Sequence, residues 1–234
     1  MSERIYEHLE DKDLLDAVSE VINSVHTDLQ SIDKSLHSNV IDPFSALFDA
    51  SMQNISYEEW LEQEKMRQVQ KTLQNAIGYF HETIIGKLNG WNQLSQGGYD
   101  VENKRKKVFA ELKNKHNTMN SSTSEAVYTK MAEFLDGEKN GHTAYVVIVI
   151  PKSSNRYNKT FAPSVRGTRL PERDDLKVVD GATFYEIATG DSEALNKLYA
   201  SLPEAIKHVT DVTDKNYAPN LESFQELFEK AFSS

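Results

Sequence analysis

The first ninety residues have the hydrophobic spacing of amphipathic helices. Between residues 11 and 36, apolar side chains recur at intervals of three and four positions, which gives a helix one apolar side: Leu14, Leu15, Val18, Val21, Ile22, Val25 and Leu29. Pro43 disfavours continuation of that helix. Residues 56–90 then predict a longer helix, with Ser56 and Glu59 spaced as a capping box and Gly90 near its end.

After Gly97 and Gly98 the period of the pattern changes to two, which predicts strands. We expect strands at 99–101, 107–113, 144–150 and 178–187, and helices at 122–135 and 192–208. This order is typical of an α/β fold in which helices cover both faces of a mixed β-sheet. We divide the chain into a helical N-terminal region, residues 1–54, and a core, residues 55–234.

Charge and composition narrow the class of protein. The net charge is -10, but residues 100–170 contain 13 Lys and Arg against 7 Asp and Glu, whereas the remainder contains 13 against 29. A local basic excess favours a nucleic-acid partner despite the acidic total. The absence of cysteine excludes disulfides and thiol chemistry. The charged N-terminus and a longest apolar run of only residues 144–150 predict a cytoplasmic protein with no membrane partner.

One strand carries the residues with the clearest chemistry. In the strand at 107–113, alternation places Glu111 and Lys113 on the same face. The polar segment 102–107 reads as a hairpin turn, which would bring Asp100 beside Glu111. Two carboxylates, with the carbonyl of Leu112, suit Mg²⁺. A bound Mg²⁺ can activate water and neutralise a phosphodiester, and Lys113 would favour hydroxide.

The alternative, non-catalytic interpretation of Glu111 and Lys113 is a solvated cross-strand salt bridge. The bare pattern Glu-x-Lys occurs three times, at Glu10, Glu102 and Glu111. Only the third occurrence lies in an apolar strand with an upstream aspartate at hairpin distance. That context favours a metal-dependent nuclease, but both interpretations remain open on these residues alone.

The same residues also resemble a known family. Asp100, ten intervening residues and then Glu111-Leu112-Lys113 resemble the core of the PD-(D/E)xK nucleases, with Tyr99 where that pattern often has proline. The runs "AELKNKHNTMNSS", "RQVQKTLQNAIGYFHETIIG", "IPKSSNRYNKTFAP" and "DGATFYEIATG" resemble a family of type II restriction endonucleases that includes enzymes cutting GGNCC. The similarity covers roughly residues 55 to 210.

The resemblance implies a PD-(D/E)xK (restriction-endonuclease-like) fold and a Mg²⁺-dependent homodimer. Such an enzyme would cut both strands of double-stranded DNA at a short palindromic GC-rich site and leave 5′-phosphates. Asp100, Glu111 and Lys113 would be catalytic, with Asp100, Glu111 and Leu112 as metal ligands. Residues 1–54, which the nuclease core does not need, are our candidate for part of the dimer interface, and we expect the loops of 55–234 to recognise DNA.

Supporting residues flank this strand. Glu82, on the long helix, is our candidate for a third metal-binding carboxylate, although a solvated glutamate is about equally plausible; His81 is a weaker candidate. We expect DNA contacts from polar and basic side chains after the catalytic strand and in the loop after residue 150: Lys115, His116, Asn117, Thr118, Arg156, Asn158, Lys159, Arg166 and Arg169. A solvated loop is the alternative there.

Two other functions stay open on the sequence. A structure-selective repair or recombination nuclease would share the same three catalytic residues. A non-catalytic interaction protein could use the acidic helical half for binding a partner. Nucleotide cofactors are not expected, because the chain contains no glycine-rich phosphate-binding motif.

Overall fold

The computed structural model describes residues 4–38, 41–210 and 221–232, and the chain forms two compact units. The core unit comprises residues 1–18 and 81–234, and the helical unit comprises residues 19–80. This differs from the sequence-based boundary at residue 54, because residues 55–80 group with the helices that precede them. The expected roles of 1–54 and 55–234 stay predictions, and residues 1–3, 39–40, 211–220 and 233–234 lie outside the described residues.

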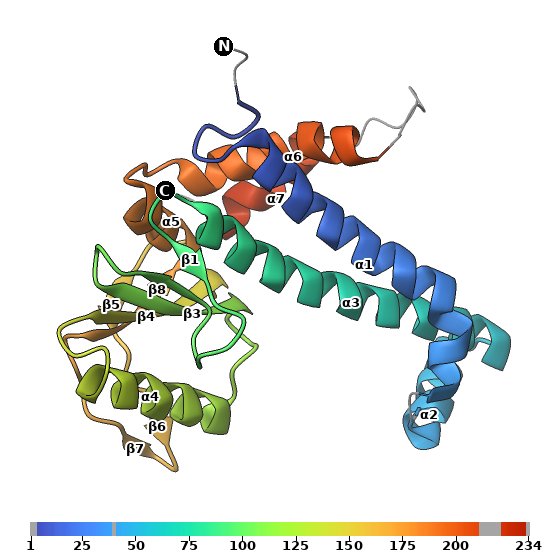
Figure 1. Ribbon diagram of the computed structural model, residues 1–234. Helices are drawn as coiled ribbons and strands as arrows, with labels where there is room; N and C mark the ends of the chain where they lie inside the picture. The colour runs from blue at the N-terminus through green and yellow to red at the C-terminus, as the bar shows by residue number, and fades with distance from the viewer. Residues whose placement is uncertain (1–3, 39–40, 211–220, 233–234) are drawn as a thin grey trace. The chain divides into compact units, whose positions relative to one another are not determined.

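Three helices build the helical unit: α1 (Asp11–Ser38) from residue 19, α2 (Pro43–Gln53), and α3 (Tyr57–Lys87) up to residue 80 (Figure 1). The predicted capping box is confirmed, since Ser56 N–H donates to Glu59 Oε2 at 2.9 Å and Glu59 N–H donates to Ser56 Oγ at 3.2 Å. Pro43 begins α2, where the first turn needs no N–H from it. A small core around Ile32 and Val69 holds the unit together.

A six-stranded mixed sheet forms the centre of the core unit, in the order β1-β2-β3-β4-β8-β5. Its strands are β1 (Asn92–Gln93), β2 (Val101–Asn103), β3 (Val108–Lys115), β4 (Thr143–Ile150), β5 (Asn158–Thr160) and β8 (Leu176–Asp180). Strands β3, β4 and β8 are parallel, while β1, β2 and β5 pair in antiparallel fashion. A separate hairpin contains β6 (Ser164–Val165) and β7 (Thr168–Arg169). The predicted mixed sheet is confirmed.

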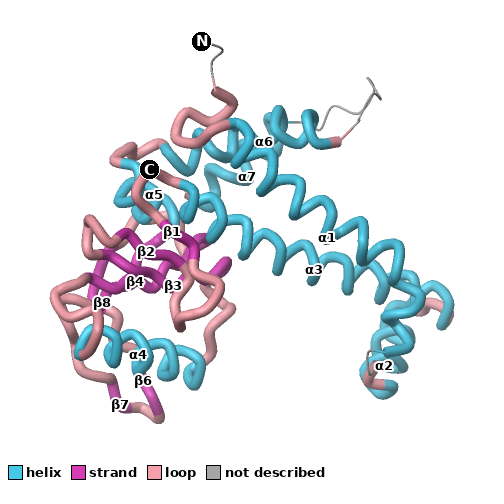
Figure 2. The backbone as a smooth tube through the Cα atoms, in the orientation of Figure 1, coloured by secondary structure: helices cyan, strands magenta, loops and turns pink. Residues whose placement is uncertain are grey.

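Helices cover both faces of this sheet, as predicted (Figures 1 and 2). Helix α4 (Ser121–Asp136) lies on one face and buries Val127, Met131 and Leu135 against Phe109 and strand β4. Helix α5 (Gly181–Thr189) lies on the other face, together with α6 (Ala194–Val209) and α7 (Leu221–Ala231). Because Phe109, Glu111 and Lys113 share a face of β3, Glu111 and Lys113 lie on the α4 side.

The predicted strand at 178–187 is wrong beyond Asp180, because the chain turns there into α5. The carboxylate of Asp180 caps the helix by accepting the Thr183 N–H at 2.9 Å, which stabilises the first turn. Gly181 permits the sharp transition, since a Cβ there would lie 2.4 Å from the carbonyl oxygen of Val149. The buried residues Gly181, Phe184, Tyr185 and Ala188 recur at spacings of three and four, which is the period of a helix and not the alternation of a strand.

Candidate active site

The β2–β3 hairpin brings Asp100 next to Glu111. Val101 pairs with Ala110, so Asp100 lies across from Glu111. The backbone N–H of Asp100 donates to the carbonyl of Ala110 at 2.9 Å. The Asp100 Oδ2 atom accepts the N–H of Leu112 at 2.6 Å. The strand register therefore places both carboxylates at the middle of β3, as the hairpin reading predicted.

Two lysines hold the buried carboxylate of Glu111. Lys113 Nζ lies 2.7 Å from Oε1, and Lys130 Nζ lies 2.9 Å from Oε2. The Lys113 contact confirms that positions 111 and 113 share a face, and it is also the ion pair of the non-catalytic interpretation. Lys130 projects from α4 and was missed, because nothing in its local sequence shows that α4 crosses β3 at this point. Glu111 is thus a position that binds cationic groups at both oxygens.

Glu82 lies in the part of α3 that belongs to the core unit, and the charges of Asp100, Glu111 and Lys113 act on its carboxyl group. Burial and, after it, the nearby charge of Asp100 together raise the pKa of Glu82 to about 7, although a hydrogen bond from Gln93 opposes this shift. Burial also raises the pKa of Asp100, and the charge of Glu111 adds to this effect. These carboxylates repel one another when ionised, so the cluster favours an added positive charge.

His81 points to a different place from its neighbour Glu82. Its Nδ1 lies 2.8 Å from the hydroxyl of Tyr185 on α5, and burial lowers its pKa to about 4. It therefore stays neutral near pH 7 and does not join the carboxylate cluster.

A close approach of β1 to α3 positions the Gln93 side chain. A Cβ on Gly86 would lie 2.5 Å from Gln93 Cβ and 2.7 Å from Gln93 N, so only glycine fits there without movement. Thr83 Oγ1 donates to Gln93 Oε1 at 3.2 Å and orients the amide that meets Glu82. In the sequence, the only sign of this contact is that Gly86 lies inside a helical pattern. A glycine at such a position does not show which residue packs against it.

The donor set of the cluster fits a divalent metal ion. Asp100, Glu111 and Glu82 offer hard carboxylate oxygens, the ligand type that Mg²⁺ and similar ions take. Two ammonium groups contact Glu111, whereas the raised pKa values of Asp100 and Glu82 are signs of negative charge that these lysines leave unneutralised. A bound cation would supply the charge that this arrangement lacks.

The first group of expected DNA contacts lies at the C-terminal end of β3. Lys115 pairs with Ile150 across β3 and β4, and His116 N–H donates to the carbonyl of Ile150 at 3.1 Å. Asn117 and Thr118 follow in a turn that leads towards α4. Because β3 and β4 are parallel, this turn and the loop after β4 leave the same edge of the sheet.

The second group is spread over three places. Asn158 and Lys159 lie on the edge strand β5, separated from β3 by β4 and β8. Arg156 pairs with Glu186 at 3.0 Å. Arg166 and Arg169 belong to the β6–β7 hairpin, where Arg169 pairs with Glu172. The Ser121 hydroxyl binds the carbonyl of Ser164, so this hairpin is attached at the start of α4.

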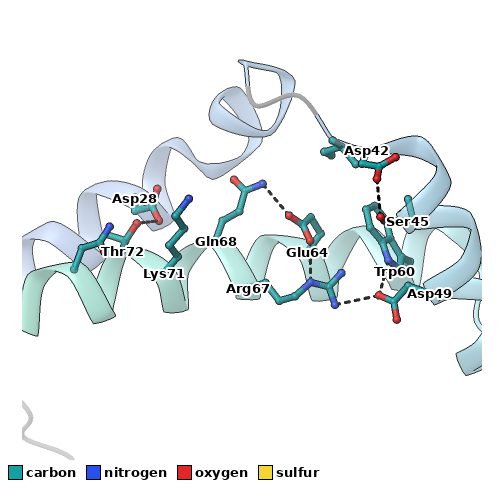
Figure 3. Close-up of a pocket in the computed structure, with 13 residues that line it drawn as sticks. Asp28, Asp42, Ser45, Asp49, Trp60, Glu64, Arg67, Gln68, Lys71 and Thr72 are labelled. Carbon is teal, nitrogen blue, oxygen red and sulfur yellow. Dashed lines mark hydrogen bonds and ion pairs between the residues drawn. The ribbon is translucent and has the colours of Figure 1, made fainter. Parts of the chain in front are cut away.

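A large cavity lies elsewhere, in the helical unit. It has a volume of about 830 Å³ and is lined by residues of α1, α2 and α3 (Figure 3). Its carboxylates already have partners: Asp28 accepts from Thr72 at 2.8 Å, and Asp49 accepts from Trp60 Nε1 at 3.0 Å. The cavity contains ordinary structural hydrogen bonds and none of the expected site residues.

An acidic cluster with metal-ligand spacing also lies away from Asp100. Among the described residues, Glu7, His8 and Asp191 bring ligand atoms within 4.8 Å of one another. The ammonium of Lys197 already lies 2.6 Å from Glu7 and 2.8 Å from Asp191. An internal cation thus neutralises this cluster, in contrast to Glu82 and Asp100.

Comparison with known proteins gives consistent matches along the chain. Residues 6–211 match the family described as Eco47II restriction endonuclease. The chain is 35% identical to the type II restriction enzyme Eco47II of Escherichia coli over 237 aligned residues, which cover 97% of this chain and 99% of that protein. It is 30% identical to the type II restriction enzyme Sau96I of Staphylococcus aureus, and that alignment covers 99% of this chain and 91% of that protein. Within the described ranges, no helix has the length and apolar character needed to cross a membrane.

Proposed function

We propose that Asp100, Glu111 and Lys113 form the catalytic centre of this chain, which belongs to the Eco47II restriction endonuclease family. The chain is a type II restriction enzyme, a site-specific deoxyribonuclease that acts on double-stranded DNA. The observation that carries the proposal is the contact of Asp100 with the strand that presents Glu111 and Lys113 side by side. This is the geometry expected of a PD-(D/E)xK core, and we assign the chain to that fold on this basis.

Restriction endonucleases generally use a divalent metal ion, and we assign Mg²⁺ to this site. Asp100 and Glu111 are its carboxylate ligands, the carbonyl of Leu112 is a backbone ligand, and Glu82 adds a third carboxylate. When bound, the ion neutralises the scissile phosphate and lowers the pKa of a coordinated water. The raised pKa values of Asp100 and Glu82 support this assignment, because both groups are stabilised in their charged form by a cation.

Lys113 positions the attacking water. Its ammonium now lies on Glu111 Oε1, and its charge stabilises hydroxide and the negative charge that develops on the phosphate. Asp100 is oriented by the Leu112 N–H, so the reacting groups are fixed by backbone of the central strand. Hydrolysis of one phosphodiester bond per strand leaves 5′-phosphates.

DNA binding is assigned to the loops at the ends of the central strands. Lys115, His116, Asn117 and Thr118 contact the backbone next to the scissile phosphate, in a turn that adjoins the N-terminus of α4. The arginines and polar residues after β4 supply further contacts: Arg156, Asn158, Lys159, Arg166 and Arg169. Arginine binds guanine bidentately in the major groove, which suits a GC-rich site such as GGNCC.

A homodimer follows from the symmetry of the reaction. A palindromic site presents the same sequence on both strands, and a two-fold protein matches it with one catalytic centre per strand. The structure-selective nuclease and the non-catalytic interaction protein do not fit membership in a family of type II restriction enzymes.

Digestion of DNA tests the proposed specificity. The purified protein is incubated with Mg²⁺ and two unmethylated plasmids that differ only in a single GGNCC site, with EDTA as the metal control. We expect one double-strand cut at the added site, and sequencing of the ends should locate it. Cuts at positions unrelated to GGNCC would overturn the assigned site, and cutting in EDTA would overturn the metal dependence.

A further inference from the structure

Helix α2 exposes its large apolar side chains instead of burying them. Phe44, Leu47, Phe48 and Met52 are 75%, 68%, 69% and 85% exposed. Their spacing of three and four places them on one side of the helix. We call these four residues the α2 apolar face.

The opposite side of α2 attaches it to the helical unit through small and polar groups. Asp49 accepts from Trp60 Nε1 at 3.0 Å and pairs with Arg67 at 3.5 Å. Ala46 and Ala50, on the same side, are partly buried. A surface helix of a monomeric globular protein normally packs its large apolar side chains against the protein and exposes its small and polar ones. A contiguous apolar surface of this kind marks an interaction site.

The apolar surface continues from α2 onto the start of α3. A groove of about 650 Å³ runs between them, lined by Pro43, Leu47 and Tyr57 among others, and Tyr57 is 63% exposed. With about 200 Å² for each fully exposed side chain, the α2 apolar face and Tyr57 together present roughly 700 Å². This approaches the roughly 800 Å² that each partner contributes to an interface of standard size.

We propose that the α2 apolar face is where two copies of this chain meet. The pairing is antiparallel about a two-fold axis that passes near Phe48, so that the same surface serves both copies. The α2 apolar face has no charged residue, as expected for the core of a protein interface and unlike a surface that binds DNA, which needs lysine or arginine. The need for two copies rests on the proposed function, whereas the exposed apolar face is an independent observation.

Sedimentation velocity tests the contact in the metal-free protein without DNA. We expect the wild type to be a dimer and Phe48→Glu to be a monomer, with a dimer dissociation constant raised at least 30-fold. Gln70→Glu, at an exposed position of α3 outside the α2 apolar face, is the charge-matched control and should remain a dimer. A monomeric wild type, or a Phe48→Glu variant that dimerises as the wild type does, would overturn the proposal.

Cross-linking provides a second test that tolerates a folding defect in the charged variant. The chain contains no cysteine, so Phe48→Cys introduces a single thiol that a two-fold axis places next to its own copy. Mild oxidation should give a covalent dimer with Phe48→Cys and not with Gln70→Cys. Equal cross-linking of both variants, or of neither, would contradict the antiparallel pairing.

The oligomeric state and DNA cleavage separate the two proposals. A protein that dimerises through α2 but does not cleave DNA refutes the assigned catalysis and leaves the interface standing. A protein that cleaves its site while Phe48→Glu stays dimeric refutes the interface and leaves the catalysis standing.

Discussion

Replacement of Glu82 by glutamine should stabilise the metal-free protein at neutral and alkaline pH. In the wild type, burial and the charge of Asp100 raise the pKa of Glu82 from 4.5 to about 7. The folded protein therefore retains a proton that the unfolded chain has already lost between these two pH values. Stability must then fall as the pH rises through that window. Glutamine keeps the shape and the contact with Gln93 but cannot ionise.

The size of the effect follows from the same pKa. A pKa raised from 4.5 to about 7 corresponds to about 3 kcal/mol of lost stability above pH 7. Solvent around the partly buried side chain screens the charges, so we expect about 1–2 kcal/mol. Below pH 4.5 both states hold the proton, and Glu82→Gln and the wild type should have nearly equal stability.

Urea unfolding in EDTA at pH 4.5, 6 and 8 measures this difference. Glu133→Gln on the exposed side of α4 is the matched control and should follow the wild type at every pH. Parallel pH profiles for the wild type and Glu82→Gln would refute the reasoning. Calorimetry should also show weaker Mg²⁺ binding by Glu82→Gln, since one carboxylate ligand is lost.

Three further substitutions test other contacts of the core unit. Lys130→Met should bind Mg²⁺ several-fold more tightly in calorimetry, because no ammonium competes for Glu111 Oε2; equal or weaker binding would contradict this. Gly86→Ala should lower the free energy of unfolding by about 1–3 kcal/mol, since its Cβ overlaps Gln93; an unchanged urea midpoint would argue against it. Asp180→Ala should cost about 2–4 kcal/mol by removing a buried helix cap, and a loss below 0.5 kcal/mol would contradict that role.

The parts of the site that sequence could predict are local. Alternation within one strand places Glu111 beside Lys113, and a short polar turn brings Asp100 to the same strand. Both inferences need only the geometry of a hairpin. The capping box at Ser56 and Glu59 is equally local, and it formed as predicted.

The parts that sequence could not predict depend on packing between distant elements. Lys130 reaches Glu111 only because α4 crosses the sheet next to β3. The requirement for glycine at position 86 becomes clear only once β1 is known to lie against α3. The wrong strand prediction at 178–187 also reflects packing between distant elements. The side chain of Asp180 caps a helix there, and the close contact of Gly181 with Val149 accommodates its first turn.

Single-turnover cleavage of a duplex with one site tests the catalytic assignment most directly. Lys113→Met is compared with Lys139→Met, which breaks another buried lysine–glutamate pair, at Glu102, outside the assigned centre. We predict that Lys113→Met lowers the cleavage rate by about 10²–10⁴-fold, while its binding to the same duplex in EDTA, followed by fluorescence anisotropy, changes little. Lys139→Met should cleave at nearly the wild-type rate. Full activity of Lys113→Met would contradict the account and leave Glu111 and Lys113 as a structural ion pair.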